Sequence, residues 1–150
     1  MGDVAVTTHG GTGATGVTGR CTYLSAPGGT GIAPTGGSVA GGATVPFTGS
    51  GFTGATDVSF GGTPASSFTV VSDTQITATS PARSAGVADV TVTTPGGTST
   101  TGVTDRFTYL SAPGVTGIAP TSGSVAGGAT LTITGSGFTG ATDVSFGGTP

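Results

Sequence analysis

An internal repeat is the feature that most constrains how this chain folds. The stretch GSGFTGATDVSFGGTP occupies residues 49–64 and recurs at residues 135–150. The same offset of 86 residues holds without a gap from the pair Asp3 and Asp89 to the pair Pro64 and Pro150. A unit of this length suits a small β-sandwich and exceeds the roughly 20–50 residues of solenoid repeats. The repeat therefore predicts tandem copies of one small domain.

The repeat divides the chain into one whole unit and two partial units. Residues 25–110 are expected to form the complete unit. Residues 1–24 are expected to be the C-terminal part of a first unit, and residues 111–150 the N-terminal part of a truncated third unit. Residues 65–88 have no counterpart elsewhere in the chain.

Two interpretations account for the partial units. The chain is either a window cut from a longer repeat protein, or the C-terminal part of one molecule meets the N-terminal part of the next. In the second interpretation the contact joins two different surfaces, so its repetition from molecule to molecule would form an open filament. Because the joined halves would still lack a counterpart of residues 65–88, the sequence favours the window. Between units the linker is only YLSAPG (23–28 and 109–114), which predicts a fairly stiff rod.

Short runs of alternating apolar and polar residues predict β-strands along the whole unit. The chain holds 32 Gly and 9 Pro, but only 6% of its residues are charged, which favours short strands joined by Gly-rich turns over disorder. After an opening GIAP at residues 31–34, strands are expected at 41–52, 56–60, 67–72, 74–80, 87–97 and 104–109. The alternation puts these side chains on inward faces: Val58, Phe60, Phe68, Val70, Ile76, Ala78, Val90, Val92, Phe107 and Tyr109. No stretch has helical periodicity, so an all-β, immunoglobulin-like sandwich is expected.

Ordered motifs along the unit give a specific resemblance. They are the Ile-x-Pro-x-x-Gly opening, the GSGF turn after a GG-T strand, V-x-FGGTPA, SDTQITATSPA, VTVTTPGG and a closing FTY. Taken together over residues 114–150 and 65–109, these motifs resemble the IPT/TIG family of immunoglobulin-like domains. The resemblance implies an all-β domain of the kind present in extracellular bacterial proteins, glycan-processing enzymes, receptor ectodomains and some transcription factors. It implies no catalytic activity.

Charge and composition argue against two classes of partner. The net charge is −3, and the only cations besides the single histidine are Arg20, Arg83 and Arg106. Three dispersed arginines cannot form the basic stripe that neutralises phosphates, so neither nucleic acid nor an anionic membrane is expected as a partner. The sequence has no apolar run long enough to span a bilayer.

One glycine motif imitates a cofactor site. Residues 11–16, GTGATG, match G-x-G-x-x-G after a strand, but a dinucleotide site needs a helix to start there. The residues that follow run instead toward CTYL, another strand. We interpret the motif as a Gly-rich turn and expect no cofactor.

Two differences between the repeats carry structural expectations. Cys21 replaces Phe107 and, as the only cysteine, is expected to be a buried, inert thiol, with an intermolecular disulfide as the alternative. A nucleophilic role would need His9, the only histidine, as its base. Pro46 replaces Thr132 and should lie where no ladder hydrogen bond is needed or at a bulge.

The charged residues form no catalytic or metal-ligating constellation. The six aspartates are dispersed, and the repeat pairs Asp57 with Asp143 and Asp3 with Asp89 recur at strand starts, as turn-forming residues do. A loop cation held by aspartate and carbonyl oxygens remains the less favoured alternative. Arg106 and its counterpart Arg20 are expected at the surface or paired with aspartate. No catalytic, cofactor-binding or metal residue is assigned.

Three function classes follow from these observations. The favoured one is a non-catalytic structural or interaction module, in which tandem units form a stalk, adhesin or filament outside the cell. Its expected partners are neighbouring repeats or identical subunits head to tail, with a surface glycan or a protein ligand as further options. A glycan-binding accessory module of a secreted enzyme is the alternative, with Tyr23 and Tyr109 as the sugar platforms. A DNA-binding domain is disfavoured by charge, and an enzyme is not expected. The N-terminus lacks signal-peptide features, so Met1 is interpreted as a start placed before a fragment of an extracellular or cell-surface protein.

Overall fold

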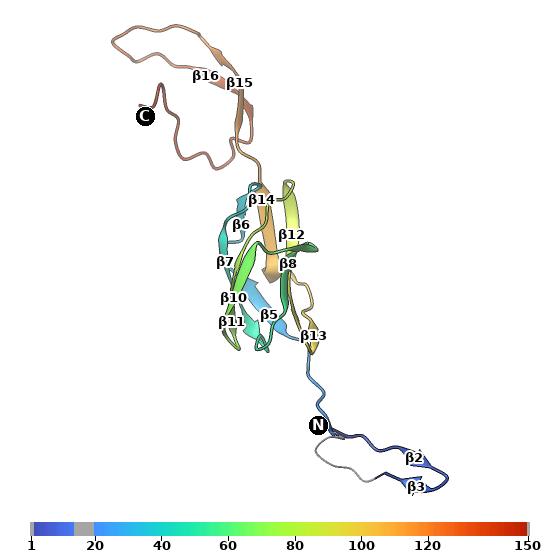
Figure 1. Cartoon of the computed structure of the whole chain (residues 1–150). Helices are drawn as coiled ribbons and strands as arrows, with labels where there is room; N and C mark the ends of the chain where they lie inside the picture. Colours follow the sequence, from blue (N-terminus) through green and yellow to red (C-terminus); the bar gives the residue numbers. More distant parts are fainter. Residues whose placement is uncertain (1, 14–19, 150) are drawn as a thin grey trace. The chain divides into compact units, whose positions relative to one another are not determined.

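Antiparallel β-strands dominate the computed structural model, which describes residues 2–13 and 20–149 (Figure 1). It separates into two compact units, Met1–Tyr109 and Leu110–Pro150. The complete repeat unit holds β5 (Gly28–Ile32), β6 (Gly36–Ser38), β7 (Thr44–Ser50), β8 (Asp57–Phe60), β9 (Thr63–Pro64), β10 (Ser67–Ser72), β11 (Gln75–Thr79), β12 (Gly86–Thr94), β13 (Gly97–Thr98) and β14 (Arg106–Leu110). One 3-10 turn, η2 (Val103–Asp105), precedes β14.

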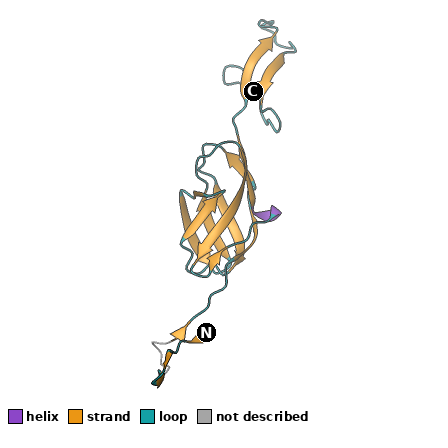
Figure 2. Cartoon of the chain, turned by 90° about the vertical axis from the view of Figure 1, so that its right-hand side faces the viewer, coloured by secondary structure: helices purple, strands orange, loops and turns teal. Residues whose placement is uncertain are grey.

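Two sheets form the complete unit. One sheet has the strand order β10-β11-β7-β5, and the other has the order β6-β14-β12-β8-β9, with β13 paired to β12. Figure 2 shows these strands as two layers at the centre of the chain. The chain therefore has the predicted fold class: all-β, with one complete immunoglobulin-like sandwich flanked by two partial units.

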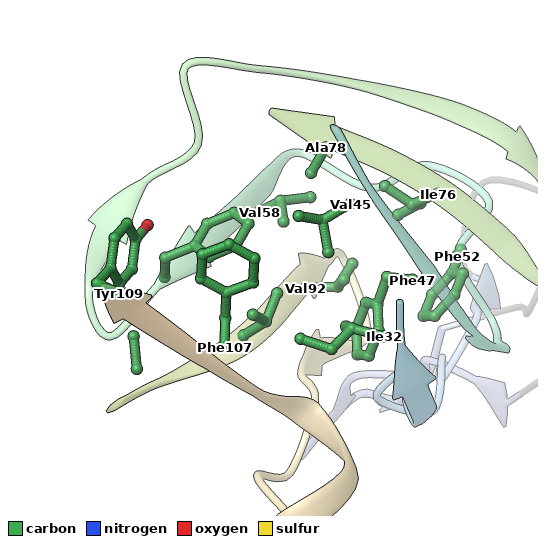
Figure 3. Close-up of a cluster of buried hydrophobic side chains, with 13 residues drawn as sticks. Ile32, Val45, Phe47, Phe52, Val58, Ile76, Ala78, Val92, Phe107 and Tyr109 are labelled. Carbon is green, nitrogen blue, oxygen red and sulfur yellow. The ribbon is translucent and has the colours of Figure 1, made fainter. Parts of the chain in front are cut away.

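The core lies between the two sheets and follows the period-two pattern. On β8, and on β12 from Ala88 onward, buried and half-buried side chains alternate. Phe60, Phe107 and Tyr109 stack edge to face, with ring centroids 5.0–6.5 Å apart. The buried set, most of it labelled in Figure 3, is Ile32, Val45, Phe47, Phe52, Val58, Phe60, Ile76, Ala78, Ala88, Val90, Val92, Phe107 and Tyr109. Removing this apolar surface from water is what holds the unit together.

Two residues predicted to face inward, Phe68 and Val70, share the face of the buried Ala78 and Ile76 but are not fully buried. Val70 is 36% exposed, and Phe68 on the same strand is only half-buried against the core. Strand β10 is the edge strand of its sheet, and its register with β11 shifts between Val70 and Ser72. Because the edge strand covers only the margin of the core, alternation does not bury its side chains fully.

The complete unit begins and ends at opposite ends of β12. A Cβ on Gly96, in the turn from β12 to β13, would collide with the backbone of Ser25, so the chain enters the unit beside that turn. At the other end of β12, Gly86 pairs with Tyr109, just before the chain leaves the unit. A nine-residue strand is about 30 Å long, so start and end are separated by that distance.

The N-terminal segment pairs its strands as the last part of the complete unit does. Its strands are β1 (Gly2–Asp3), β2 (Thr7–Thr8), β3 (Gly11–Thr12) and β4 (Arg20–Cys21). Asp3 pairs with Arg20 as Asp89 pairs with Arg106, 86 residues later. The register of β2 with β3 likewise repeats that of β12 with β13.

The C-terminal unit repeats the first part of the complete unit. Strand β15 (Gly114–Ala119) pairs with β16 (Thr132–Ser136) in the register of β5 with β7, including the shift between Val115 and Gly117 that reproduces the one between Gly29 and Gly31. Both copies also share a cis peptide before proline, at Ala33–Pro34 and Ala119–Pro120. The described residues contain no helix with the length and hydropathy needed to cross a bilayer.

Candidate interaction surface

The corner between β7 and β8 of the complete unit is held by one carboxylate. Asp73 Oδ1 accepts hydrogen bonds from the Thr53 hydroxyl at 2.7 Å and the Thr53 amide at 3.2 Å, and Oδ2 accepts one from the Gly51 amide at 3.2 Å. These donors favour the charged carboxylate and lower the pKa of Asp73 below 3.8. The carboxylate thus fixes the GSGFTG corner between β7 and β8 and is engaged in structure.

A second carboxylate is buried beside a glycine. Asp105 in η2 is 2% exposed, and its Oδ1 accepts a hydrogen bond from the Thr104 hydroxyl at 3.3 Å. A Cβ on Gly29 would come within 3.1 Å of that oxygen and would collide with the ring of Phe47. Gly29 is therefore required by the close approach of β5 to these two side chains.

The Tyr109 ring is part of the core, so its assignment as a sugar platform is wrong. Tyr109 is 1% exposed because β14 turns it inward against Phe60 and Phe107. Burial raises the pKa of its phenol, and the charge of Arg83 and the Ser80 hydroxyl offset part of that effect. Its counterpart Tyr23 in the N-terminal segment is 79% exposed.

The described arginine side chains are engaged within the fold. Arg83 donates a hydrogen bond from Nη1 to the carbonyl oxygen of Phe60, at 2.5 Å. Arg106 Nε lies 3.4 Å from Asp89 Oδ1, as the aspartate-paired prediction expected. Arg20 lies in β4, and its side chain falls outside the described part of the chain. Neither described arginine is left as part of a free basic patch.

The Cys21 thiol is exposed, so the prediction of a buried thiol was wrong. Cys21 pairs with Gly2 in a two-stranded ribbon, and among the described residues no second sheet packs on this ribbon as one does on Phe107 in the complete unit. His9 lies in the turn between β2 and β3, and no hydrogen bond within the described residues joins it to Cys21.

The glycine motif at residues 11–16 is only partly described. Gly11 and Thr12 form β3, which pairs with β2 in a hairpin. Residues 14–16 of the motif lie outside the described residues. The described start of the motif is a strand, whereas a dinucleotide site requires the start of a helix.

The aspartates that recur between the units lie apart from other metal-ligating residues. Asp57 starts β8, and Asp143 lies at the corresponding point of the C-terminal unit. Asp3 and Asp89 occupy equivalent positions on β1 and β12. Within residues 2–13 and 20–149, no three His, Cys, Asp or Glu residues gather closely enough to hold a metal ion.

An apolar groove opens in the C-terminal unit instead. We call it the C-terminal groove; it has a volume of about 720 Å³, and the apolar side chains that line it include Ile118, Leu131, Ile133, Phe138, Val144 and Phe146. Val144 and Phe146 are 52% and 56% exposed, whereas their repeat counterparts Val58 and Phe60 are completely buried. The groove thus exposes side chains whose repeat counterparts lie in the core of the complete unit.

Sequence reasoning expected the partial units to leave an exposed core face, but it did not name the residues that line this groove. The lining residues Leu131, Ile133, Val144 and Phe146 have the counterparts Val45, Phe47, Val58 and Phe60, which are fully buried in the complete unit. Residues 111–150 contain no copy of β11, β12 and β14. Subtracting one unit from the other along the sequence would have predicted which side chains remain uncovered.

The sandwich, its register and its glycine corners define an immunoglobulin-like module. Two segments of the chain, residues 28–109 and 113–150, match the family model of the IPT/TIG domain. The matched residues make up most of the chain, so the chain belongs to the IPT/TIG family. Domains of this family are non-catalytic immunoglobulin-like modules. Comparison with curated protein sequences gives no match.

Solved structures share parts of this fold. A gamma-CGTase from alkalophilic Bacillus clarkii is 29% identical with a TM-score of 0.50, over 60% of this chain and 13% of the enzyme. The extracellular region of plexin A4 is 23% identical with a TM-score of 0.49, over 61% of this chain and 8% of plexin. SGBP-B from a xyloglucan utilization locus in Bacteroides uniformis is 24% identical with a TM-score of 0.45, over 65% of this chain and 27% of that protein. The chain thus spans a small part of each of these larger proteins.

Proposed function

We propose that the chain is a non-catalytic structural and interaction module of an extracellular protein, in which tandem IPT/TIG units form a stalk, adhesin or filament. The observation that carries this proposal is the path of the chain through the complete unit. Ser25 lies beside the turn that ends β12, and Tyr109 pairs with Gly86 at the start of β12. A unit that is entered at one end and left at the other adds its length of about 30 Å to any array that contains it.

Two further features support a structural role. Two charged side chains of the complete unit are engaged in the fold: Asp73 holds the GSGFTG corner, and Arg83 donates to the Phe60 carbonyl. The linker between β14 and β15 is only Ser111 to Pro113, which leaves little room for independent motion of the units. The short linker favours a stiff array.

The test is a length series. One, two or three further copies of residues 25–110 are inserted in tandem after Leu110, and the maximum dimension is measured by small-angle X-ray scattering. Each copy is expected to add about 30 Å. A matched series with a flexible Gly-Ser insertion in each linker should lengthen less per unit. A maximum dimension that stays constant as copies are added would contradict the stalk.

The glycan-binding alternative is tested separately. Tyr23 is the exposed tyrosine on which it depends, since Tyr109 is buried. Co-sedimentation with insoluble polysaccharides, using wild type and Tyr23→Ala, is expected to show no retention of either protein. Retention that Tyr23→Ala abolishes would instead support an accessory module that binds glycan.

A further inference from the structure

The complete unit has one long strand edge that is open to a further strand. Strand β10 pairs with β11 on one side, and among residues 2–13 and 20–149 no strand pairs with it on the other. At the opposite edge of the same sheet, β5 packs against η2. The edges of the second sheet are short, since β6 has three residues and β9 has two, one of them Pro64. An additional strand is therefore best accommodated beside β10.

The sequence of β10 does little to discourage such pairing. It reads SFTVVS and contains no charged residue, proline or glycine. Edge strands in natural proteins usually avoid pairing through lysines, prolines, bulges or short length. The register of β10 with β11 shifts only between Val70 and Ser72, so residues 67–70 form a regular edge. The open side of these residues presents unpaired backbone groups in strand geometry.

Two apolar side chains of β10 are only partly removed from water. Phe68 is half-buried at the margin of the core, and Val70 is 36% exposed. Both face the side on which Ala78 and Ile76 of β11 are buried. A strand placed beside β10 would cover them and extend the core of the complete unit sideways, which is favourable because apolar surface leaves water.

We propose that β10 pairs with β10 of a second copy of this chain, antiparallel and about a two-fold axis at Thr69. Residues directly opposite each other in an antiparallel pair lie on the same face of the sheet. In this register Phe68 of each copy lies opposite Val70 of the other, and Thr69 lies opposite Thr69. The two four-stranded sheets become one continuous sheet, and four partly exposed apolar side chains meet on its inner face.

Charge and side-chain pattern favour a second copy as the occupant of this edge. The chain has a net charge of −3, but neither β10 nor β11 contains a charged residue, so two copies can meet here without opposing like charges. A neutral edge offers no attraction to an acidic or basic segment. Shifted registers match less well: an axis at Phe68 puts Val70 opposite Ser66, and an axis at Val70 puts Phe68 opposite Ser72.

The size and direction of the contact have two consequences. It involves residues 67–71 of each copy, far fewer than the roughly 20–30 residues a side of a standard interface, so the dimer is expected to be weak and reversible. Because the paired strands are antiparallel, the two units run in opposite directions, as they would in stalks that extend toward each other. Several units pairing at once would add avidity. The contact goes beyond the proposed function, and only its use between stalks rests on that function.

The first experiment measures the dimer Kd of the full chain by sedimentation velocity over a concentration series, with reductant present because Cys21 is exposed. Thr69→Lys places two like charges opposite each other at the axis and is expected to raise the Kd at least about tenfold at low salt. Thr44→Lys, at an exposed threonine on the same outer face but on β7, is the matched control and should dimerise as wild type does. Each lysine changes the net charge equally, and urea unfolding verifies that both variants are folded.

The second experiment tests the position of the axis by charge pairing. Thr69→Lys and Thr69→Asp are each expected to dimerise more weakly than wild type. An equimolar mixture of the two is expected to form a one-to-one dimer, because the axis places opposite charges directly across from each other. A mixture of Thr44→Lys and Thr44→Asp should dimerise no more strongly than either variant alone, since β7 lies two strands away from the paired edge.

Three results would overturn the proposal. Wild type that stays monomeric at every concentration leaves the β10 edge to a strand of another protein. Association that Thr69→Lys does not weaken places the contact elsewhere in the chain. A mixture of Thr69→Lys and Thr69→Asp that dimerises no better than either variant rules out the two-fold register. The length series described above is run with Thr69→Lys in every copy of the unit, so that the stalk is tested independently of this pairing.

Discussion

At the residue scale, burial decides what an identical side chain contributes. Phe60 and Phe146 lie in the same local sequence, VSFGGTP, and both follow a valine two residues earlier. Phe60 is fully buried against Phe107 and Tyr109, whereas Phe146 is 56% exposed. The repeat therefore offers a comparison in which residue type and neighbours are constant and only the environment differs.

We expect Phe60→Ala to lower the free energy of unfolding of the complete unit by about 3–5 kcal/mol, since it removes a buried ring and leaves a cavity. Phe146→Ala should cost less than about 0.5 kcal/mol, because an exposed side chain away from specific contacts contributes little. Urea unfolding followed by circular dichroism, at a concentration low enough to keep the chain monomeric, measures both values. Equal costs for the two variants would contradict the assignment of the core.

At the element scale, the corner between β7 and β8 has the same glycine geometry in both copies, but only the copy in the complete unit is held by Asp73. Gly51 and Gly137 both have positive φ, at 72° and 74°. A Cβ on Gly49 or on Gly135 would collide with a backbone carbonyl and a phenylalanine ring in each copy. Only the complete unit adds the carboxylate of Asp73 from the turn before β11. The corner forms from local sequence, and the distant carboxylate then ties it to the neighbouring strand.

That carboxylate predicts a pH dependence with a definite sign. The hydrogen bonds from Thr53 and Gly51 lower the folded-state pKa of Asp73, so its contribution to stability is complete above the unfolded value of 3.8. The contribution is lost as the pH falls through the lower folded-state pKa. We therefore expect the urea midpoints of wild type and Asp73→Asn to differ at neutral pH and to converge as the pH falls through the lowered folded-state pKa of Asp73.

Two threonine variants serve as the comparison for this prediction. Thr53→Val removes the hydroxyl that contributes most to the lowered pKa of Asp73, so part of the acid-sensitive difference should disappear. Thr139→Val changes the repeat counterpart of Thr53, which has no partner equivalent to Asp73 in the sequence, and should leave the acid dependence unchanged. A midpoint difference that does not vary with pH would refute the role of the carboxylate.

At the scale of the whole molecule, stability is concentrated in the complete unit. Its two sheets bury thirteen apolar residues between them. The described residues of the partial units carry large exposed apolar side chains, among them Val6, Tyr23, Val115 and Phe146. A single layer of strands cannot remove its apolar face from water, so the partial units gain little of the free energy that stabilises the sandwich.

Hydrogen–deuterium exchange of the full chain at low concentration should show this difference directly. Amides of β7, β8, β11 and β12 are expected to exchange most slowly, because they open only when the complete unit unfolds. Amides of β15 and β16 should exchange far faster, although their register is that of β5 and β7. Equal protection of β7 and β16 in the monomer would show that the C-terminal unit is stable by itself.

The sequence predicted most of the fold through two local signals. Period-two alternation identified the inward faces of β8, β11, β12 and β14, and the offset of 86 residues identified the units. Pro46 also lies where the sequence expected it. The Pro46 carbonyl accepts a hydrogen bond from the amide of Ala33, which is one residue beyond the end of β5. The N–H that proline lacks would lie on the same side, where β5 no longer continues the ladder, so no strand hydrogen bond is lost.

Only the tertiary structure decided which apolar faces are covered. Alternation gave Val70 the same inward direction as Val90, but an edge strand leaves the first exposed and a central strand buries the second. The repeat likewise gave Cys21 the buried position of Phe107, but the structure exposes its thiol. Alternation put Tyr109 inward and the glycan-binding alternative put it at the surface, and the structure buries it. Local sequence determines the direction in which a side chain points along its strand. Whether that direction leads to a core or to water depends on whether a second sheet packs on the strand, as it does in the complete unit.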